Sequence, residues 1–261
     1  MQIFLIEGAG NRFAVVDTLR GSTPSDPGAL AREWAAHPPL PGFRPDGVLV
    51  MSADPEAHLR MAIYNADGSR PAACGNGLRC IAQAAVDLGH VQPGTFTIAT
   101  DAGLRQVEVD GQGARTALGR ARILGSQVLG VEGRPVSGVH VDLGNPHLVL
   151  CRDLWSDSDV ERIGFGLQNH PMFPGGVNVG FATRTPEGLV LRVFERGVGE
   201  TLACGTGACA AAVALTDLRE PVRVFAPGGE LCVERRANGE LWLAGPVRQV
   251  GRFESPAPSA A

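Results

Sequence analysis

Two segments of this chain repeat each other, and each carries one cysteine in front of a glycine-rich turn and an alanine-rich stretch. The first segment covers 73–88 and holds Cys74, and the second covers 203–218 and holds Cys204, an offset of 130 residues. A Gly-Asn pair at 10–11 also recurs at 144–145, and each pair is expected to be a turn between two strands, the first of which includes 3–6 in the N-terminal half. A period of this length is far too long for a solenoid. The repeat therefore predicts two halves built on one plan and related by a pseudo-twofold axis.

The pattern between the repeated segments favours an α+β fold, with many short strands and one long helix in each half. Strands are expected at 47–51, 58–64, 96–99, 105–109, 139–142, 189–194, 222–226, 231–235 and 240–244, and helices at 26–36, 77–88, 157–165 and 207–218. The segment 245–254 is expected to return to the first half. We therefore expect an N-terminal half of 1–118 plus 245–254, a C-terminal half of 119–244, and a disordered tail at 255–261.

Composition excludes several classes of protein. With 261 residues and a net charge of −4, the chain has room for a large core but no basic surface for nucleic acid. No apolar run is long enough to span a bilayer, and the N-terminus lacks a signal-peptide pattern, which favours a cytoplasmic location. All 23 basic residues are arginine, so a pyridoxal Schiff base and a P-loop, which both need lysine, are excluded. No Cys-x-x-Cys pair occurs, which argues against a zinc site.

A cysteine that precedes Gly-x-Gly at the start of a helix lies where backbone N–H groups have no partner within the helix. Such a turn binds an anion, most simply a carboxylate, and the helix dipole lowers the pKa of a thiol there. We therefore expect lowered thiol pKa values at Cys74 and Cys204. Two such thiols suit the inversion of an α-carbon, because one acts as base on one face while the other acts as acid on the opposite face. The remaining cysteines are expected to be inert packing residues: Cys80, Cys151, Cys209 and Cys232.

Two long motifs resemble the signatures of the diaminopimelate epimerase family. The first runs from Tyr64 through Asn-Ala-Asp-Gly-Ser to Cys-Gly-Asn-Gly-Leu-Arg-Cys at 74–80, and the second is Glu-Arg-Gly-Val-Gly-Glu-Thr-Leu-Ala-Cys-Gly-Thr-Gly at 195–207. Gly-Asn-Pro-His at 144–147 and Asn-Val at 178–179 fit the same family, so the resemblance covers nearly the whole chain. The sequence departs from the family at Arg12, where an acidic residue is usual, and at 42–47, where Gly-x-Gly-Ala-Asp is often found.

The resemblance implies two pseudo-symmetric β-roll-like halves, each around a central helix, in a homodimeric enzyme that uses neither cofactor nor metal. It implies that Cys74 and Cys204 are the acid/base thiols and that His147 and Glu195 help to deprotonate them. The implied substrate-binding residues are Asn11, Asn65, Gly75, Asn76, Asn145, Asn178, Glu195, Arg196, Gly205 and Thr206. Arginine grips a carboxylate as a fork, and Glu and Asn oxygens accept from an ammonium, so this set suits a substrate with an amino acid at each end.

The resemblance predicts interconversion of LL- and meso-2,6-diaminopimelate, a reaction on a small molecule in the biosynthesis of lysine and peptidoglycan precursors. Two alternatives are open from the sequence. A racemase of another amino acid, such as proline or histidine, shares the thiol chemistry, although Glu195 and Arg196 favour a substrate with a second charged end. A non-catalytic carboxylate-binding module is the other alternative, and the presence of both Cys74 and Cys204 argues against it.

Overall fold

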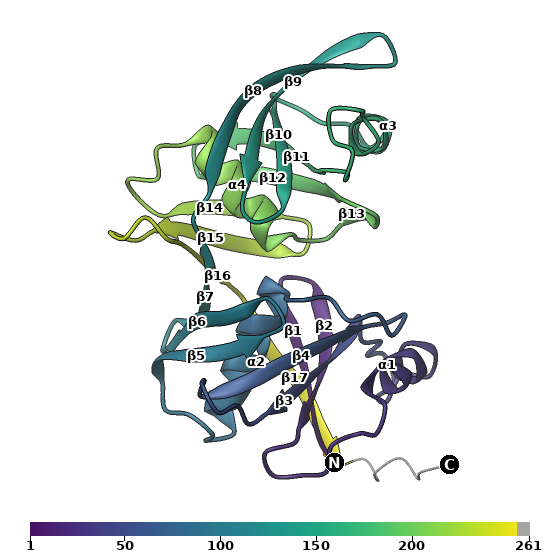
Figure 1. Cartoon of the computed structure of the whole chain (residues 1–261), viewed down its shortest axis with the longest axis vertical. Helices are drawn as coiled ribbons and strands as arrows, with labels where there is room; N and C mark the ends of the chain where they lie inside the picture. Colours follow the sequence, from purple (N-terminus) through teal and green to yellow (C-terminus); the bar gives the residue numbers. More distant parts are fainter. Residues whose placement is uncertain (255–261) are drawn as a thin grey trace. The chain divides into compact units, whose positions relative to one another are not determined.

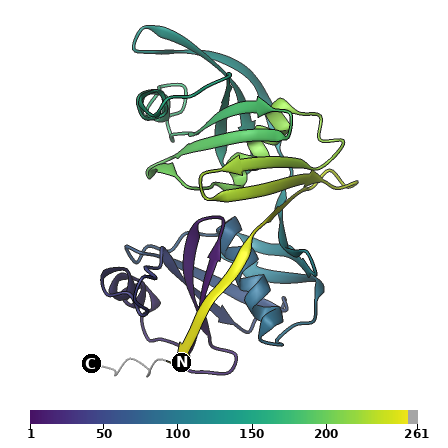
Figure 2. The ribbon, with the colours of Figure 1, turned by 180° about the vertical axis from the view of Figure 1, so that it is seen from behind.

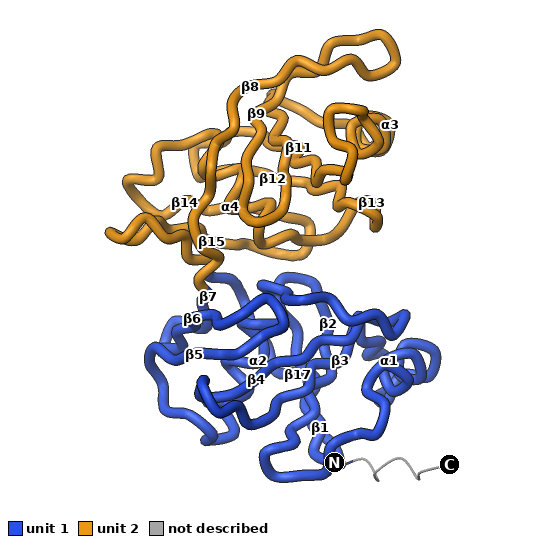
Figure 3. Tube along the Cα trace, viewed as in Figure 1, with its two compact units in different colours: residues 1–116, 244–261 blue, residues 117–243 orange. Residues whose placement is uncertain are grey.

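The computed structural model describes residues 1–254; the tail expected to be disordered, 255–261, lies outside the described residues. The chain divides into two compact units (Figure 3). Unit 1 contains Met1–Thr116 together with the chain from Ala244 onward, and unit 2 contains Ala117–Leu243. None of the described helices is long and apolar enough to cross a membrane.

Unit 1 is a mixed sheet with two helices (Figure 1). Its elements are β1 (Gln2–Gly8), β2 (Asn11–Asp17), α1 (Pro27–Ala36), β3 (Gly47–Ser52), β4 (Leu59–Asn65), α2 (Gly75–Asp87), β5 (Gly94–Thr100), β6 (Gly103–Asp110), the start of β7 (Gly113–Gly119) and β17 (Val247–Glu254). The strands pair in the spatial order β17, β1, β2, β3, β4, β5, β6, β7. The pairs β2·β3 and β4·β5 are parallel, and the other pairs are antiparallel.

Unit 2 repeats this arrangement with its own elements. They are β8 (Arg122–Val131), β9 (Arg134–Asp142), β10 (Pro146–Cys151), α3 (Asp157–Gln168), β11 (Asn178–Thr185), β12 (Gly188–Glu195), β13 (Gly199–Thr201), α4 (Gly205–Leu215), β14 (Val222–Ala226), β15 (Gly229–Arg235) and most of β16 (Leu241–Gly245). The spatial order is β8, β9, β10, β11, β12, β14, β15, with β10·β11 and β12·β14 parallel, and β13 also pairs with β12.

The two units therefore share one topology as well as one sequence motif. In both, the first helix connects the first parallel pair of strands and the cysteine-bearing helix connects the second. The strand registers agree too: Phe13 pairs with Gly47 across β2·β3, and His147 pairs with Asn178 across β10·β11. The α+β fold with two pseudo-symmetric halves that the sequence predicted is confirmed.

The helix that follows each repeated cysteine is enclosed by the strands of its unit, as Figures 1 and 2 show for α2. Helix α2 contacts β1, β2, β3, β4, β6 and β17, and α4 contacts β9, β10, β11, β12, β14 and β15. In α4, Ala210, Ala211 and Ala212 are each 0 % exposed. An alanine side chain is a single methyl group, so it lets strands approach such a helix closely on every side.

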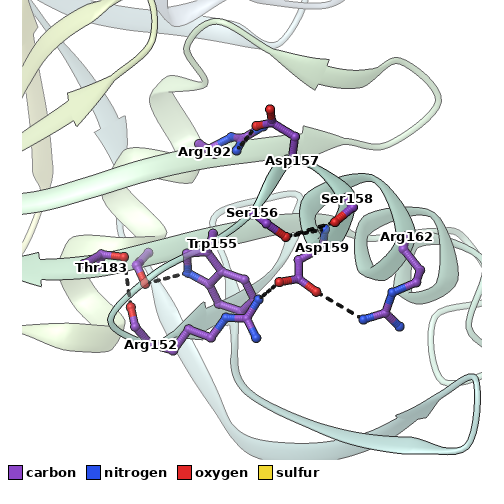
Figure 4. A network of polar contacts seen from close by, with 10 residues as sticks. Arg152, Trp155, Ser156, Asp157, Ser158, Asp159, Arg162, Thr183 and Arg192 are labelled. Atoms are coloured by element: carbon purple, nitrogen blue, oxygen red, sulfur yellow. Dashed lines mark hydrogen bonds and ion pairs between the residues drawn. The ribbon is translucent and has the colours of Figure 1, made fainter.

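Helix α3 is fixed to the strands of unit 2 at both of its ends. Near its start, Asp159 pairs with Arg152, whose guanidinium lies 3.8 Å from the ring centre of Trp155 (Figure 4). The Trp155 indole donates to a backbone carbonyl of β11 at 2.9 Å. At the other end, Gln168 donates through Nε2 to the backbone carbonyl of Glu195 on β12 at 2.8 Å. The helix thereby supports the strand end that carries Glu195.

The helices that follow the cysteines begin two residues earlier than the sequence pattern predicted. They start at Gly75 and Gly205 rather than at 77 and 207, with Cys74 and Cys204 as the N-cap residues. The glycines suggested that a turn precedes each helix. The helix can nevertheless begin at Gly75 or Gly205, because the first N–H groups of a helix need no partner within it. The glycines instead permit close packing: a Cβ on Gly205 would lie 2.7 Å from the Leu243 side chain. At the other end, α4 stops at Leu215, short of the expected 218, and the backbone becomes extended.

The predicted strands are all present within a few residues, and 245–254 does return to unit 1, because β17 pairs with β1. The sequence pattern missed β7, β8, β11 and β13. Strand β8 shows why: it contains a register shift between Ile123 and Gly125, and its apolar residues Ile123 and Val128 are 57% and 69% exposed. A strand with a bulge and exposed apolar residues lacks the regular alternation by which strands are recognised.

Substitution of Ala211 by leucine should destabilise the protein, because three extra carbon atoms have no space inside the enclosed helix α4. Overpacking of this kind costs about 1–3 kcal/mol. Ala29→Leu on the exposed side of α1 is the matched control and should leave stability almost unchanged. Thermal unfolding followed by circular dichroism measures both variants. Equal midpoints for the two would contradict the enclosure of α4.

Candidate active site

The repeated position in unit 1 places Cys74 at the N-cap of α2, where the Cys74 backbone is extended and the thiol is partly exposed. The Cys74 sulfur accepts a hydrogen bond from the backbone N–H of Gly77 at 3.4 Å. The carbonyl of Cys74 starts the helix by accepting from Leu78. The thiol therefore borders the first-turn N–H groups, as the sequence predicted.

Asn76 and Asn11 form the polar part of this half-site. Asn76 is 3 % exposed, and its Nδ2 donates to Oδ1 of Asn11 at 2.7 Å. Asn11 precedes the Phe13–Gly47 pair, at the edge of the sheet where β2 begins. Asn65 ends β4 at this same edge, opposite Gly47, and its side chain donates to Ser69 at 2.9 Å. The structure brings Asn11, Asn76 and Cys74 together and leaves Asn65 at the exposed margin.

The two departures from the family pattern lie against each other. The Arg12 guanidinium lies 5.8 Å from the ring centre of Phe43 and donates to the carbonyl of Gly42 at 3.5 Å. The backbone N–H of Arg12 donates to Asp46 at 2.8 Å. Arg12 and the segment 42–47 thus pack against each other beside Asn11. The hydrogen bond between Asn11 and Asn76 is present all the same.

The repeated position in unit 2 places Cys204 at the N-cap of α4, where it is only 7 % exposed. The Cys204 sulfur lies 3.5 Å from the hydroxyl of Thr206. That hydroxyl is also 3.1 Å from Nε2 of His147 and accepts from Nδ2 of Asn145 at 3.3 Å. Cys204, Thr206, His147 and Asn145 therefore form one continuous network. The Asn145–Thr206 contact corresponds to the Asn11–Asn76 contact of unit 1.

Glu195 is the carboxylate of this network. It ends β12, where Thr201 on β13 donates a hydrogen bond of 2.5 Å to its Oε1. Glu195 also lies within hydrogen-bonding reach of the Cys204 thiol, an interaction that favours the protonated sulfur. With Gln168 holding its backbone carbonyl, Glu195 is fixed on three sides. Neither Thr201 nor Gln168 was predicted from the sequence: Thr201 lies inside the second motif, but its contact with Glu195 depends on the pairing of β12 with β13, and Gln168 lies outside the motif on α3.

Asn178 and Arg196 extend the unit 2 half-site along the sheet edge. Asn178 donates to the carbonyl of Pro146 at 3.1 Å and accepts from the backbone N–H of Arg196 at 2.9 Å. The exposed Arg196 side chain donates to the carbonyl of Gly175 at 3.0 Å. It packs so closely over Gly176 that a Cβ there would lie 2.8 Å from the Arg196 Cδ. The remaining donors of the guanidinium are suited to a second carboxylate.

The pKa of Cys204 differs from the sequence prediction. Burial, together with the charge of Glu195, raises the pKa of Cys204 to about 12, although a lowered value was expected from the helix start. Desolvation of the thiolate outweighs the helix dipole here. Burial also lowers the pKa of His147 to about 4, so its imidazole is neutral and weakly basic. Its Nδ1 has no hydrogen-bond partner among the described residues. Glu195 is therefore the better placed group to take the Cys204 proton.

The other cysteines follow the packing prediction with one exception. Cys80 and Cys209 are fully buried, and burial raises the pKa of Cys80 to about 12. Cys232 is half-buried. Cys151 is exposed, contrary to the prediction, because it is the last residue of β10 and points away from the core. Among residues 1–254, no group of three or more His, Cys, Asp or Glu side chains is placed to hold a metal ion.

Cys204 should react slowly with iodoacetamide in the folded protein at neutral pH. At neutral pH, a thiol with a pKa of about 12 has roughly a three-thousandth of the thiolate fraction of an ordinary thiol with a pKa of about 8.5. Glu195→Gln removes a negative charge, so it should lower the pKa of Cys204 and speed the reaction. Mass spectrometry of the alkylated peptides over a range of pH measures this, with exposed Cys151 as the internal reference. Equal rates for Cys204 and Cys151 in the folded protein would contradict the burial argument.

Comparison with known proteins identifies the family of this chain. The family model described as diaminopimelate epimerase matches residues 4–124 and 139–250. The chain is 40% identical to the diaminopimelate epimerase of Xylella fastidiosa (strain M23), covering 94% of this chain and 93% of the relative. It is 38% identical to that of Halorhodospira halophila (strain DSM 244 / SL1), covering 100% of this chain and 98% of the relative.

Solved structures resemble this chain in fold. A phenazine biosynthesis protein of the PhzF family from Bacillus anthracis matches with a TM-score of 0.70 at 15% identity, covering 98% of this chain and 99% of that chain. A predicted epimerase from Pseudomonas aeruginosa matches with a TM-score of 0.69 at 17% identity, covering 97% and 98%. At these identities the likeness concerns the fold alone, whereas the family match and the sequence relatives extend over nearly the whole chain. The chain therefore belongs to the diaminopimelate epimerase family.

Proposed function

We propose that this chain interconverts LL- and meso-2,6-diaminopimelate by moving the α-proton between Cys74 and Cys204, without a cofactor. The observation that carries the proposal is the equivalent N-cap position of one cysteine in each unit of a member of this family. The curated relatives named above are diaminopimelate epimerases, which favours this reaction over racemisation of proline or histidine.

The α-carboxylate of the substrate would be held at the two helix starts. The backbone N–H groups of Gly75 and Asn76 and those of Gly205 and Thr206 belong to the first turns of α2 and α4. Donors at a helix start bind anions, and they stabilise the negative charge that spreads onto the carboxylate when the α-proton leaves. The same donors thus serve binding and the reaction.

The proton transfers balance without any oxidant or reductant. A thiolate on one face takes the α-proton, the C–H electron pair stays on the substrate, and a thiol on the other face returns a proton to the same carbon. The product has the opposite configuration, and the two sulfurs have exchanged protonation states. The raised pKa of Cys204 makes it the thiol of the resting enzyme. In the opposite direction, Glu195 would assist the removal of the Cys204 proton.

The second end of the substrate would be recognised by Arg196 together with Asn178, which accepts from the Arg196 backbone, and with Asn65 of unit 1. Diaminopimelate carries a carboxylate and an ammonium at each end, and only one end is inverted. The guanidinium of Arg196 can grip the distal carboxylate as a fork, and Glu195 and the asparagine oxygens can accept from an ammonium. Following the family resemblance, we further propose that the enzyme is a cytoplasmic homodimer that acts on this small molecule.

Incubation with LL-diaminopimelate in D₂O should produce the meso form with deuterium at the inverted α-carbon, as followed by NMR. Cys74→Ser and Cys204→Ser should each lower the rate by about 10²–10⁴-fold, because acid and base act on different faces. Cys151→Ser, at an exposed thiol, is the matched control and should retain full activity. Wild-type turnover in either single variant would refute the two-thiol mechanism, and exchange with proline or histidine but not diaminopimelate would establish the alternative substrate class.

Arg196→Lys should weaken the use of diaminopimelate by removing the planar fork while keeping the charge. The loss should appear mainly in KM, at about 10-fold or more, because a bidentate contact becomes a single one. Arg184→Lys, an exposed arginine on β11, serves as the control. Competition by a one-ended amino acid should be unaffected in Arg196→Lys. An equal loss for both ligands would mean that Arg196 acts only by packing over Gly176.

A further inference from the structure

Arg79 is a fully buried cation in the cysteine-bearing helix of unit 1. It is 0 % exposed and belongs to α2, five residues after Cys74. Its side chain turns back toward the start of its own helix. Nη2 donates to Oδ1 of Asn76 at 2.7 Å, and Nη1 donates to the carbonyl of Gly75 at 3.5 Å. The guanidinium thus lies beneath the first turn of the helix that Cys74 caps.

The contact with Arg79 fixes which way the Asn76 amide points. A guanidinium can only donate, so the atom of Asn76 that it contacts must be the oxygen. The nitrogen of Asn76 then faces Asn11, to whose oxygen it donates at 2.7 Å. The nitrogen of Asn11 in turn lies 3.5 Å from a carboxylate oxygen of Asp46. Each amide is therefore oriented by the one before it, starting from Arg79.

Unit 2 holds the residue equivalent to Asn76 by a different contact, and it therefore provides a comparison within the same chain. The position equivalent to Arg79 is Cys209, which is also 0 % exposed but uncharged. Thr206, the equivalent of Asn76, is held by His147 at 3.1 Å. The strand position of His147 is occupied in unit 1 by Phe13, which cannot hydrogen-bond. Unit 1 thus lacks a polar side chain at this strand position; Asn11 accepts from the nitrogen of Asn76, and Arg79 donates to its oxygen from inside the helix.

A buried arginine at this place is costly for folding. Removing a charge from water is unfavourable, and a cation near the positive end of a helix is opposed by the dipole. The enclosed helix of unit 2 packs without any charge at the equivalent position, so the fold itself does not require one. A costly group that the fold does not need, in contact with a candidate substrate-binding residue, points to a role in that site.

We propose that Arg79 is a positioning residue for the Cys74 half-site: it locks the side-chain amides of Asn76 and Asn11 in the orientation that receives the substrate carboxylate. This inference rests on the proposed function for its kinetic consequence. Arg79 itself would not contact the substrate, because its side chain is fully buried. Arg79 would act only through the orientation of the neutral side-chain amides of Asn76 and Asn11.

A double-mutant cycle tests the proposal. Arg79→Met, which keeps the length of the side chain without its donors, should lower kcat/KM for diaminopimelate by about 10- to 100-fold, as misplaced binding groups do. In an Asn76→Ala background the same change should cost less than about twofold, because the residue through which Arg79 acts is gone. Arg79→Lys, which keeps one charged donor, should recover part of the loss. Arg105→Met, at a partly exposed arginine of β6 that donates to the backbone carbonyl of Leu104, is the control.

A second measurement separates positioning from stability. Arg79→Met leaves the buried oxygen of Asn76 without its donor, so the unfolding temperature should fall, and the kinetics are measured well below the unfolding temperature of every variant. With [¹⁵N]asparagine labelling, the side-chain amide protons of Asn76, assigned by their loss in Asn76→Ala, should exchange faster with solvent in Arg79→Met than in the wild type. Additive losses in the cycle, or unchanged amide exchange, would overturn the proposal. If the wild type fails to epimerise diaminopimelate, the proposed function is wrong, and the amide exchange still decides the role of Arg79.

Discussion

Enclosure of a helix by the strands of its own unit is the constraint on which the rest of this structure depends. Helices α2 and α4 contact strands on most of their sides, so most of each helix must be small or apolar. Only the first turn of each helix reaches the edge of the sheet, where β2 or β10 begins and β4 or β12 ends. Cys74 and Cys204 occupy that turn as N-cap residues. Packing therefore decides where each thiol is placed and which side chains surround it.

One backbone plan supports two chemically different surroundings. Equivalent positions in the two units carry Phe13 and His147, Gly47 and Asn178, Asn65 and Glu195, and Asn76 and Thr206. The ionisable side chains in these pairs all belong to unit 2, where the thiol is nearly buried, whereas the partly exposed Cys74 is accompanied by amides. In the proposed mechanism the two thiols share one proton, and this difference would give the two sulfurs unequal affinities for it. Two identical half-sites would give neither sulfur a preference for that proton.

The sequence repeat was sufficient to predict the two halves and the place of each cysteine at the start of a helix. It was insufficient wherever burial decides the outcome. The pKa of Cys204 is raised, whereas the sequence predicted a lowered value, because desolvation depends on tertiary packing, which local motifs do not encode. Cys151 is exposed because it ends its strand, and the bulge in β8 broke the expected alternation. Arg79 stands inside the first motif and is missing from the second, a difference between copies that could have identified it from the sequence.

The last described strand has a consequence for how the chain reaches its folded state. Strand β1 pairs with β2 on one side and with β17, Val247–Glu254, on the other. The whole of unit 2 lies between these partners in the sequence. Domains generally fold as units while the chain is being synthesised from its N-terminus. All strands of unit 2 are therefore synthesised before β17, the second pairing partner of β1. The half that emerges first from the ribosome is thus the half that is completed last.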